Sequence, residues 1–266
     1  MKTFIVDSFT DHAFRGNPAG VCLAETELSD ELMLSIAQEL NFSETAFIRK
    51  RDGLGYHIRY FSPVMEIPLC GHATLASAKV LFTNRDLAEI HFYTVQGLDL
   101  HITRSDGKIV MEFPVYELEP AQISKATLNA LGLESIQHVA YNLETKILLL
   151  EIDNTEVLGN LSPNFAALVA AQDGINGILV TAACHDDTYD FHSRYFWPWS
   201  GTNEDPVTGG THTFLAKYWG QKLNKKNLKS FQASARTGNM DLELLDNGKL
   251  LIKSDAVIIL EGALNL

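Results

Sequence analysis

The sequence predicts an α+β protein of two related halves, each a curved, mostly antiparallel β-sheet or barrel around one central α-helix. Two repeated phrases carry this prediction. His57-Ile58-Arg59-Tyr60-Phe61-Ser62-Pro63 returns as His192-Ser193-Arg194-Tyr195-Phe196-Trp197-Pro198, and Glu66-Ile67-Pro68-Leu69-Cys70-Gly71-His72 returns as Glu204-Asp205-Pro206-Val207-Thr208-Gly209-Gly210. The two offsets, 135 and 138 residues, are about half of the 266-residue chain. A repeat of this length is a whole domain, because solenoid repeats are only ~20–50 residues long.

Each pair of phrases runs from an extended segment into a glycine that opens a helix. The predicted helices run from Gly71 to about Phe82 and from Gly209 to about Trp219. Residues 72–81 are small or apolar on nearly every side. This pattern predicts a buried helix at the centre of the first half.

A further helix is predicted at the front of each half. In the first half it covers Leu28–Leu40 with Ser29 as its cap, and its apolar stripe is Leu32, Ile36 and Leu40. Its counterpart lies 133 residues later, with Ser162 as the cap, Pro163 at the first helical position and a body over Phe165–Gln172.

Short strands are predicted between these helices, and a turn-rich stretch is predicted over residues 10–20. The strands of the first half are Thr3–Phe9, Thr45–Arg49, Gly55–Phe61, Leu87–Thr94, Leu98–Thr103 and Lys108–Phe113. Those of the second half are His138–Asn142, Lys146–Ile152, Gly177–Ala182, Tyr189–Phe196, Ser230–Ala235, Met240–Leu245, Leu250–Lys253 and Val257–Leu260. The pattern is interrupted near Pro114–Ala121, which predicts domains of residues 1–116 and 117–266. Whether the last strand packs back on the first domain stays open.

Composition favours a soluble globular protein and argues against two classes of partner. Apolar residues make up 46% of the chain and charged residues 20%, which is enough apolar material for two cores. The formal net charge of −12 argues against nonspecific binding to nucleic acid or to an anionic membrane. The N-terminus lacks a signal-peptide core, and no apolar run is as long as a membrane span. Three cysteines imply no disulfide framework, which fits a reducing cytoplasm.

Three polar residues are candidates for chemistry. Glu44, in an extended run, shares a face with Ala46 and Ile48, where a carboxylate can act as a general acid or base. Asp205 and His72 lie beside the two predicted helix starts, and neither has a titratable counterpart in the other half. Each has a structural alternative: an edge-strand glutamate facing water, a capping or turn aspartate, and a core histidine with its hydrogen bonds satisfied.

The two helix starts add a binding argument. Gly71-His72-Ala73 and Gly209-Gly210-Thr211 each present backbone N–H groups at the positive end of a helix. If both ends face one cleft, their amides can bind a substrate carboxylate and stabilise enolate-like charge near it.

A set of short stretches occurs in order between residue 6 and about residue 236. They are Val6–Thr10, Arg15–Gly20, Ser43–Phe47, Arg59–Pro63, Leu69–Ala76, Asp190–Phe196, Glu204–Gly209 and Gln232–Arg236. Together they resemble the PhzF family, the phenazine-biosynthesis-like isomerases with the diaminopimelate-epimerase fold.

The resemblance implies two similar domains, an active site in the inter-domain cleft and usually a homodimer. It also implies isomerisation without a cofactor, in which an acidic residue moves a proton between carbons of a small, carboxylate-bearing metabolite. The proton-moving glutamate of the family falls on Glu44, and its accompanying histidine and aspartate fall on His72 and Asp205. At one position the chain departs from the family, which commonly has serine where this chain has Gly210. That difference bears on the substrate or on the efficiency of the reaction.

Two other functions stay open on the sequence. One is a catalytically silent member that keeps the cleft and binds a metabolite or a protein partner. The other is an amino-acid epimerase, although the repeat places Thr208 opposite Cys70 and so disfavours the version with two thiols. No metal is predicted, because Cys70 and His72 lack a second pair at ligand spacing. Phosphate-loop and dinucleotide patterns do not occur.

Overall fold

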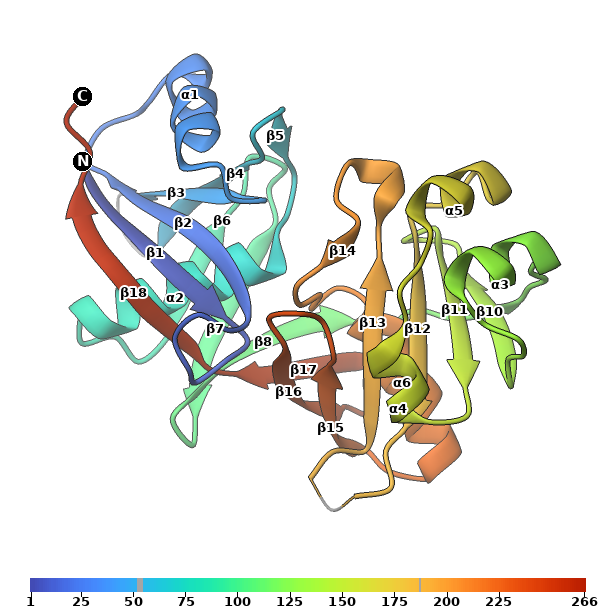
Figure 1. The fold of residues 1–266 in the computed structure, drawn as a ribbon. Helices are drawn as coiled ribbons and strands as arrows, with labels where there is room; N and C mark the ends of the chain where they lie inside the picture. Colours follow the sequence, from blue (N-terminus) through green and yellow to red (C-terminus); the bar gives the residue numbers. More distant parts are fainter. Residues whose placement is uncertain (52–54, 187) are drawn as a thin grey trace. The chain divides into compact units, whose positions relative to one another are not determined.

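A computed structural model describes residues 1–51, 55–186 and 188–266, and its contacts divide the chain into two compact units. Unit 1 consists of Met1–Glu112 and Leu251–Leu266, and unit 2 consists of Phe113–Leu250. The division after Glu112 lies close to the predicted domain boundary between residues 116 and 117. The last strand, β18 (Ala256–Ala263), pairs with β1 (Lys2–Ser8), so the C-terminal segment belongs to unit 1 rather than to a second domain running to residue 266 (Figure 1).

Unit 1 is a curved sheet that packs against one buried helix, α2 (Gly71–Asn84) (Figure 1). Antiparallel pairs join most neighbouring strands, and the β2–β3 and β4–β6 pairs are parallel. In order of pairing, the strands after β18 and β1 are β2 (Asn17–Ala24), β3 (Thr45–Lys50), β4 (Tyr56–Phe61), β6 (Ile90–Tyr93), β7 (Asp99–Ser105) and β8 (Lys108–Pro114), with β5 (Glu66–Ile67) also on β4.

Unit 2 repeats this plan around α6 (His212–Leu223). Its paired strands are β9 (Glu119–Pro120), β10 (His138–Asn142), β11 (Ile147–Ile152), β12 (Gly177–Ala183), β13 (Phe191–Phe196), β15 (Asn227–Gln232) and β16 (Gly238–Leu244), with β14 (Glu204–Asp205) also on β13. The helices α3 (Lys125–Leu131), α4 (Thr155–Asn160) and α5 (Phe165–Ala171) and a 3₁₀ turn over Pro198–Ser200 complete unit 2. The strand β17 (Lys249–Ser254) begins at the end of unit 2 and continues into the C-terminal segment of unit 1.

The two units share the same series of strand pairings. The pairs β1–β2, β2–β3, β3–β4 and β4–β6 are antiparallel, parallel, antiparallel and parallel, and so are β10–β11, β11–β12, β12–β13 and β13–β15. In matched positions, Tyr60 pairs with Ile67 and Tyr195 pairs with Asp205. The repeat in the sequence therefore corresponds to a repeat in the fold, and the predicted α+β class is confirmed.

The helix α2 forms because its residues suit a core on all sides. Ten of its fourteen residues are buried, among them alanines 73, 76 and 78, whose small side chains allow strands to pack closely around the helix. The front helix, α1 (Asp30–Leu40), has the predicted cap, since the Ser29 hydroxyl accepts the Leu32 amide. Its buried side chains are Met33, Ile36 and Ala37, and the other two residues of the predicted stripe, Leu32 and Leu40, are partly buried against the same core.

Two local predictions differ from the structure, and two helices were missed. The turn-rich stretch over residues 10–20 ends in β2, where Gly20 is needed because a Cβ would lie 2.9 Å from Thr45 Oγ1. The cap of α5 is Asn164, whose side chain accepts the Ala167 amide, rather than Ser162. The helices α3 and α4 were not predicted. Among the described residues, no helix is long and apolar enough to cross a membrane.

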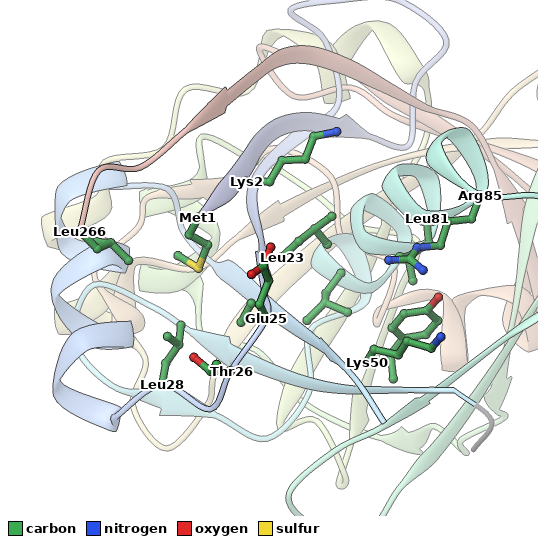
Figure 2. Close-up of a pocket in the computed structure, with 13 residues that line it drawn as sticks. Met1, Lys2, Leu23, Glu25, Thr26, Leu28, Lys50, Leu81, Arg85 and Leu266 are labelled. Carbon is green, nitrogen blue, oxygen red and sulfur yellow. The ribbon is translucent and has the colours of Figure 1, made fainter. Parts of the chain in front are cut away.

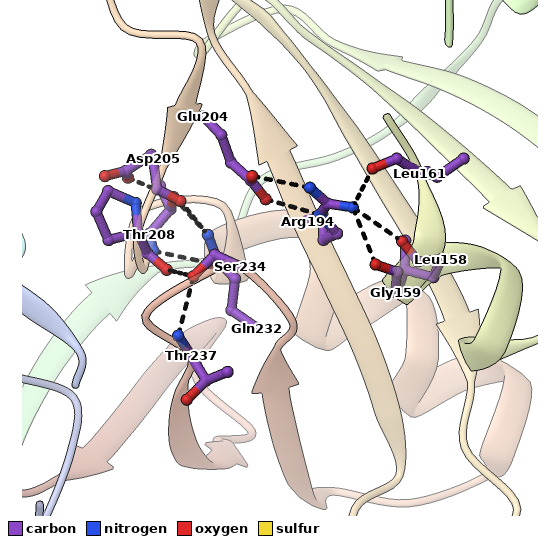
Figure 3. Close-up of polar contacts among 11 residues, drawn as sticks. Leu158, Gly159, Leu161, Arg194, Glu204, Asp205, Thr208, Gln232, Ser234 and Thr237 are labelled. Carbon is purple, nitrogen blue, oxygen red and sulfur yellow. Dashed lines mark hydrogen bonds and ion pairs between the residues drawn. The ribbon is translucent and has the colours of Figure 1, made fainter. Parts of the chain in front are cut away.

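An arginine, partly buried in unit 1 and buried in unit 2, ties each repeated phrase to its neighbour. Arg59 makes a two-point ion pair with Glu66, at 2.7 Å for each contact, and Arg194 does the same with Glu204 at 2.7 and 2.8 Å. Arg194 also donates to the carbonyls of Leu161, Leu158 and Gly159 (Figure 3). Identical residues in the two halves are thus structural at this position.

We predict that Arg194→Lys lowers the free energy of unfolding by about 2–4 kcal/mol, because an ammonium group cannot replace the planar fork that holds a carboxylate and three carbonyls. The matched control is Arg59→Lys. Its side chain is 22% exposed, against 10% for Arg194, and we expect a loss of about 1 kcal/mol. Urea unfolding of both variants measures the difference, and equal losses would contradict the assignment.

Candidate functional site

The carboxylate of Glu44 and the imidazole of His72 meet inside unit 1. Glu44 immediately precedes β3, and its backbone carbonyl accepts the Gly20 amide at 3.3 Å. His72 is the second residue of α2, and its Nε2 lies 3.2 Å from Glu44 Oε2. Each residue is only 8% exposed. The alternative in which Glu44 faces water from an edge strand is therefore wrong.

Burial sets the charge of His72. Desolvation lowers the pKa of His72, and the Glu44 carboxylate opposes this shift more weakly. The imidazole is therefore neutral at neutral pH, so its contact with Glu44 is a hydrogen bond. The other ring nitrogen, Nδ1, lies 3.4 Å from the Cys70 thiol. These partners fit the tautomer in which Nε2–H donates to Glu44 and Nδ1 accepts from the thiol.

The start of α2 offers donors to an anion. Cys70 is the N-cap residue, and its side chain makes no capping hydrogen bond. The amides of Gly71, His72 and Ala73 have no acceptor within the helix, and they lie at the positive end of its dipole. The Ser8 hydroxyl donates to the His72 carbonyl at 2.8 Å and so holds this turn against β1. The Glu44–His72 contact therefore lies at the N-terminal turn of α2.

In unit 2, Asp205 lies on β14 within a second polar cluster (Figure 3). The Thr208 hydroxyl donates to Asp205 Oδ2 at 2.5 Å. Gln232, at the end of β15, accepts the Thr208 amide and donates to the Asp205 carbonyl, at 2.8 Å in both cases. The Ser234 hydroxyl donates to the Pro206 carbonyl at 2.5 Å. The Thr208 hydroxyl thus orients the Asp205 carboxylate, and the Gln232 and Ser234 side chains hold the backbone on either side of it.

The predicted start of the second helix at Gly209 was wrong, because α6 begins at His212. The Thr208 carbonyl, four residues earlier, accepts both the Thr211 hydroxyl at 2.9 Å and His212 Nδ1–H at 3.0 Å. The His212 amide bonds instead to the Gly209 carbonyl at 3.1 Å, which makes a tighter, 3₁₀-like turn. Gly210 lies in this turn, and a Cβ added there would meet nothing within 4 Å, so a serine would fit.

The structure thus places the predicted site residues in two clusters, each within one unit. Glu44, Gly71, His72 and Ala73 lie in unit 1, and Asp205, Gly209, Gly210 and Thr211 lie in unit 2. Sequence reasoning did not assign a site role to Cys70, Thr208 or Gln232. All three lie within the short stretches that carry the resemblance described above, and this location was the sequence signal that could have identified them.

The cavity of about 700 Å³ in unit 1 is not at these residues. Its lining includes Leu81 and Arg85, at the C-terminal end of α2, together with Lys2 and Lys50 (Figure 2). His72 is at the opposite end of the same helix. The candidate site is therefore defined by the positions of its side chains, and this cavity is not part of it.

Comparison with known proteins decides the family. The model of the phenazine biosynthesis-like protein family, PhzC-PhzF, matches residues 6–262. The chain belongs to the PhzF family. It is 42% identical to mouse phenazine biosynthesis-like domain-containing protein 1 and 40% identical to an uncharacterized isomerase of Pseudomonas aeruginosa. The first alignment covers 99% of each chain, and the second covers 100% of this chain and 99% of the relative.

Solved structures agree with the PhzF assignment. The PhzF-family protein of Enterococcus faecalis superposes with a TM-score of 0.92 at 36% identity, over 100% of this chain and 99% of that one. A probable proline racemase of Agrobacterium radiobacter superposes with a TM-score of 0.60 at 12% identity, over 100% of this chain and 93% of that one. The latter likeness concerns the fold alone. This PhzF-family chain therefore has the epimerase-like fold that the sequence predicted.

Burial of His212 predicts how stability depends on pH. Its pKa is lowered to about 4, chiefly by burial, so the unfolded chain binds one more proton than the folded chain between pH 6.5 and 4. This contribution to stability is complete above pH 6.5 and is lost as the pH falls, by about 3 kcal/mol near pH 4.

In urea unfolding at a series of pH values, His212→Gln should remove this part of the pH dependence. The control is His185→Gln, at an exposed position of the same unit, which should leave the dependence unchanged. A wild-type slope in His212→Gln would contradict the assignment.

Proposed function

We propose that this protein is a cofactor-independent isomerase that moves a proton between carbons of a small, carboxylate-bearing metabolite. The observation that carries the proposal is the buried Glu44 carboxylate, hydrogen-bonded to a neutral His72 beside the uncapped start of α2. The family relationship and the relatives named as isomerases support the same class of reaction.

Each group has a defined task in this proposal. The amides of Gly71, His72 and Ala73 bind the acidic group of the substrate and stabilise negative charge that develops next to it. Glu44 removes a proton from the neighbouring carbon, and the electron pair of the broken C–H bond moves into an enolate-like system. Glu44 then returns the proton to a second carbon, so no oxidant or reductant is needed. His72 orients the carboxylate through its Nε2–H.

For unit 2, we propose that Asp205 positions a polar group of the same substrate, with Gly209, Gly210 and Thr211 supplying further amides. The Thr208 and Gln232 contacts hold Asp205 and the turn that follows it, which supports a positioning role. The proposal includes an active site shared by the two domains. It also includes a homodimer in the cytoplasm, where the three free cysteines would stay reduced.

A second candidate is a catalytically silent binding protein, which Gly210 favours because the usual serine hydroxyl of the family is missing there. An amino-acid epimerase with two thiols is disfavoured. The matched strand pairings place Thr208 at the position in unit 2 that corresponds to Cys70 in unit 1. This position therefore carries a hydroxyl, which donates to Asp205, and not a second thiol.

Incubation of the protein with a panel of small carboxylic acids in heavy water tests the proposal. We predict that one compound gains deuterium at carbon, detected by mass spectrometry, and that Glu44→Gln lowers the rate about 10²–10⁴-fold through loss of general acid/base catalysis. Glu39→Gln, at an exposed position of α1, is the matched control and should keep the wild-type rate.

Label that persists in Glu44→Gln would remove Glu44 from the proposed role. If no compound gains label while the same compounds still raise the melting temperature, the binding protein becomes the better account.

A further inference from the structure

Glu44, Cys70 and His72 offer three different metal-ligating groups in one small buried space. One ligand atom of each residue lies within 4.8 Å of the others. His72 Nε2 is 3.2 Å from Glu44 Oε2 and 3.8 Å from Cys70 Sγ. In a tetrahedral zinc site with bonds of about 2.0 Å to nitrogen and oxygen and about 2.3 Å to sulfur, neighbouring ligand atoms are roughly 3.3–3.6 Å apart. The His72–Glu44 separation is close to this range, and the His72–Cys70 separation exceeds it by a few tenths of an ångström.

The types of donor point to one class of ion. Thiolate and imidazole select zinc-like, borderline-soft divalent cations over calcium or magnesium, and one carboxylate completes the set of three ligands found at open zinc sites. The Cys70 thiol lies at the N-cap of α2, beside the start of the helix that carries His72. The Nε2 atom of His72 faces the Glu44 carboxylate and can bind an ion once the ring proton moves to Nδ1.

We propose that Glu44, Cys70 and His72 form a binding site for a zinc-like divalent cation, and that the bound ion blocks proton transfer. The ion binds the Glu44 oxygen, the Cys70 sulfur and the His72 nitrogen, and the thiol proton is released to solvent. Glu44, which transfers the proton in the proposed function, and His72, which orients it, are then both occupied. Only the blocking step rests on the proposed function, because binding requires nothing beyond the three side chains.

A second cluster in unit 1 provides an internal comparison. Glu89, His91 and His101 also bring ligand atoms within 4.8 Å of one another, on the exposed side of the β6–β7 hairpin. His101 Nε2 lies 2.7 Å from Glu89 Oε2, and His91 and His101 are cross-strand partners. This cluster contains no sulfur, so a thiolate–metal signal distinguishes the two sites.

Titration with Co²⁺, followed by visible and near-ultraviolet absorption, tests the binding. We expect a sulfur-to-cobalt charge-transfer band that saturates at one equivalent and that Zn²⁺ abolishes by displacement. Cys70→Ser should remove the band, and His72→Gln should weaken Co²⁺ binding at least about tenfold. Cys22→Ser, at the other buried cysteine, and His101→Gln should keep the band. Circular dichroism of each apo variant verifies that it is folded.

A band that persists in Cys70→Ser, or the lack of any thiolate band in the folded wild type, would overturn the site. Binding that disappears only in His101→Gln would overturn it equally, because the ion would then belong to the hairpin.

The blocking step is tested in the deuterium assay. Zn²⁺ should abolish exchange, a chelator should restore it, and Cys70→Ser should need at least about tenfold more Zn²⁺ for the same inhibition. Exchange that continues with the site saturated would overturn the blocking step. Failure of the isomerase proposal looks different, because no compound is then labelled while the cobalt band still forms.

Discussion

The hydrogen bond between His72 and Glu44 depends on the burial of α2, because His72 lies in the first turn of that helix. The sheet of unit 1 encloses α2 almost completely, so His72 enters the core as soon as the helix begins. Burial makes the imidazole neutral, and a neutral imidazole can orient a carboxylate without forming an ion pair with it. Close packing of strands around small residues thus creates a carboxylate that is shielded from water and contacts a side chain of the first turn of the helix. That combination is what proton abstraction next to an acid group requires.

Comparison of the two units distinguishes positions that hold the fold together from positions whose side chains differ between the units. Arg59 and Arg194 each pair with the glutamate at the equivalent position of their own unit. The residues are the same because each unit needs the same contact between a strand and the segment that follows it. At positions where the repeat differs, the side chains serve different local networks. Cys70 contacts His72, whereas its counterpart Thr208 donates to Asp205. Duplication therefore preserves the scaffold and leaves the residues at the helix starts free to specialise.

Much of the fold could be predicted because the repeat and the buried helix are local patterns. The cap of α1 and the start of α2 follow directly from neighbouring residues. The start of α6 could not be found in this way, since it depends on side chains that compete for the Thr208 carbonyl. The strand β2 was read as a turn because its glycine and proline are poor strand formers in isolation, although close approach to Thr45 requires a glycine there. Contacts such as Glu44–His72 join distant parts of the chain, and a single sequence contains the residues but not their separation.

The neutral His72–Glu44 pair can be tested without knowledge of the substrate. Histidine-labelled protein, with His72 assigned through His72→Gln, would be titrated by ¹⁵N NMR. The account predicts that the pKa of His72 lies below its ordinary value of about 6.5 and that the proton is on Nε2 at neutral pH. It also predicts a further fall of this pKa in Glu44→Gln, because the carboxylate charge is lost. A pKa of His72 at or above the ordinary value, or a proton on Nδ1, would contradict the account.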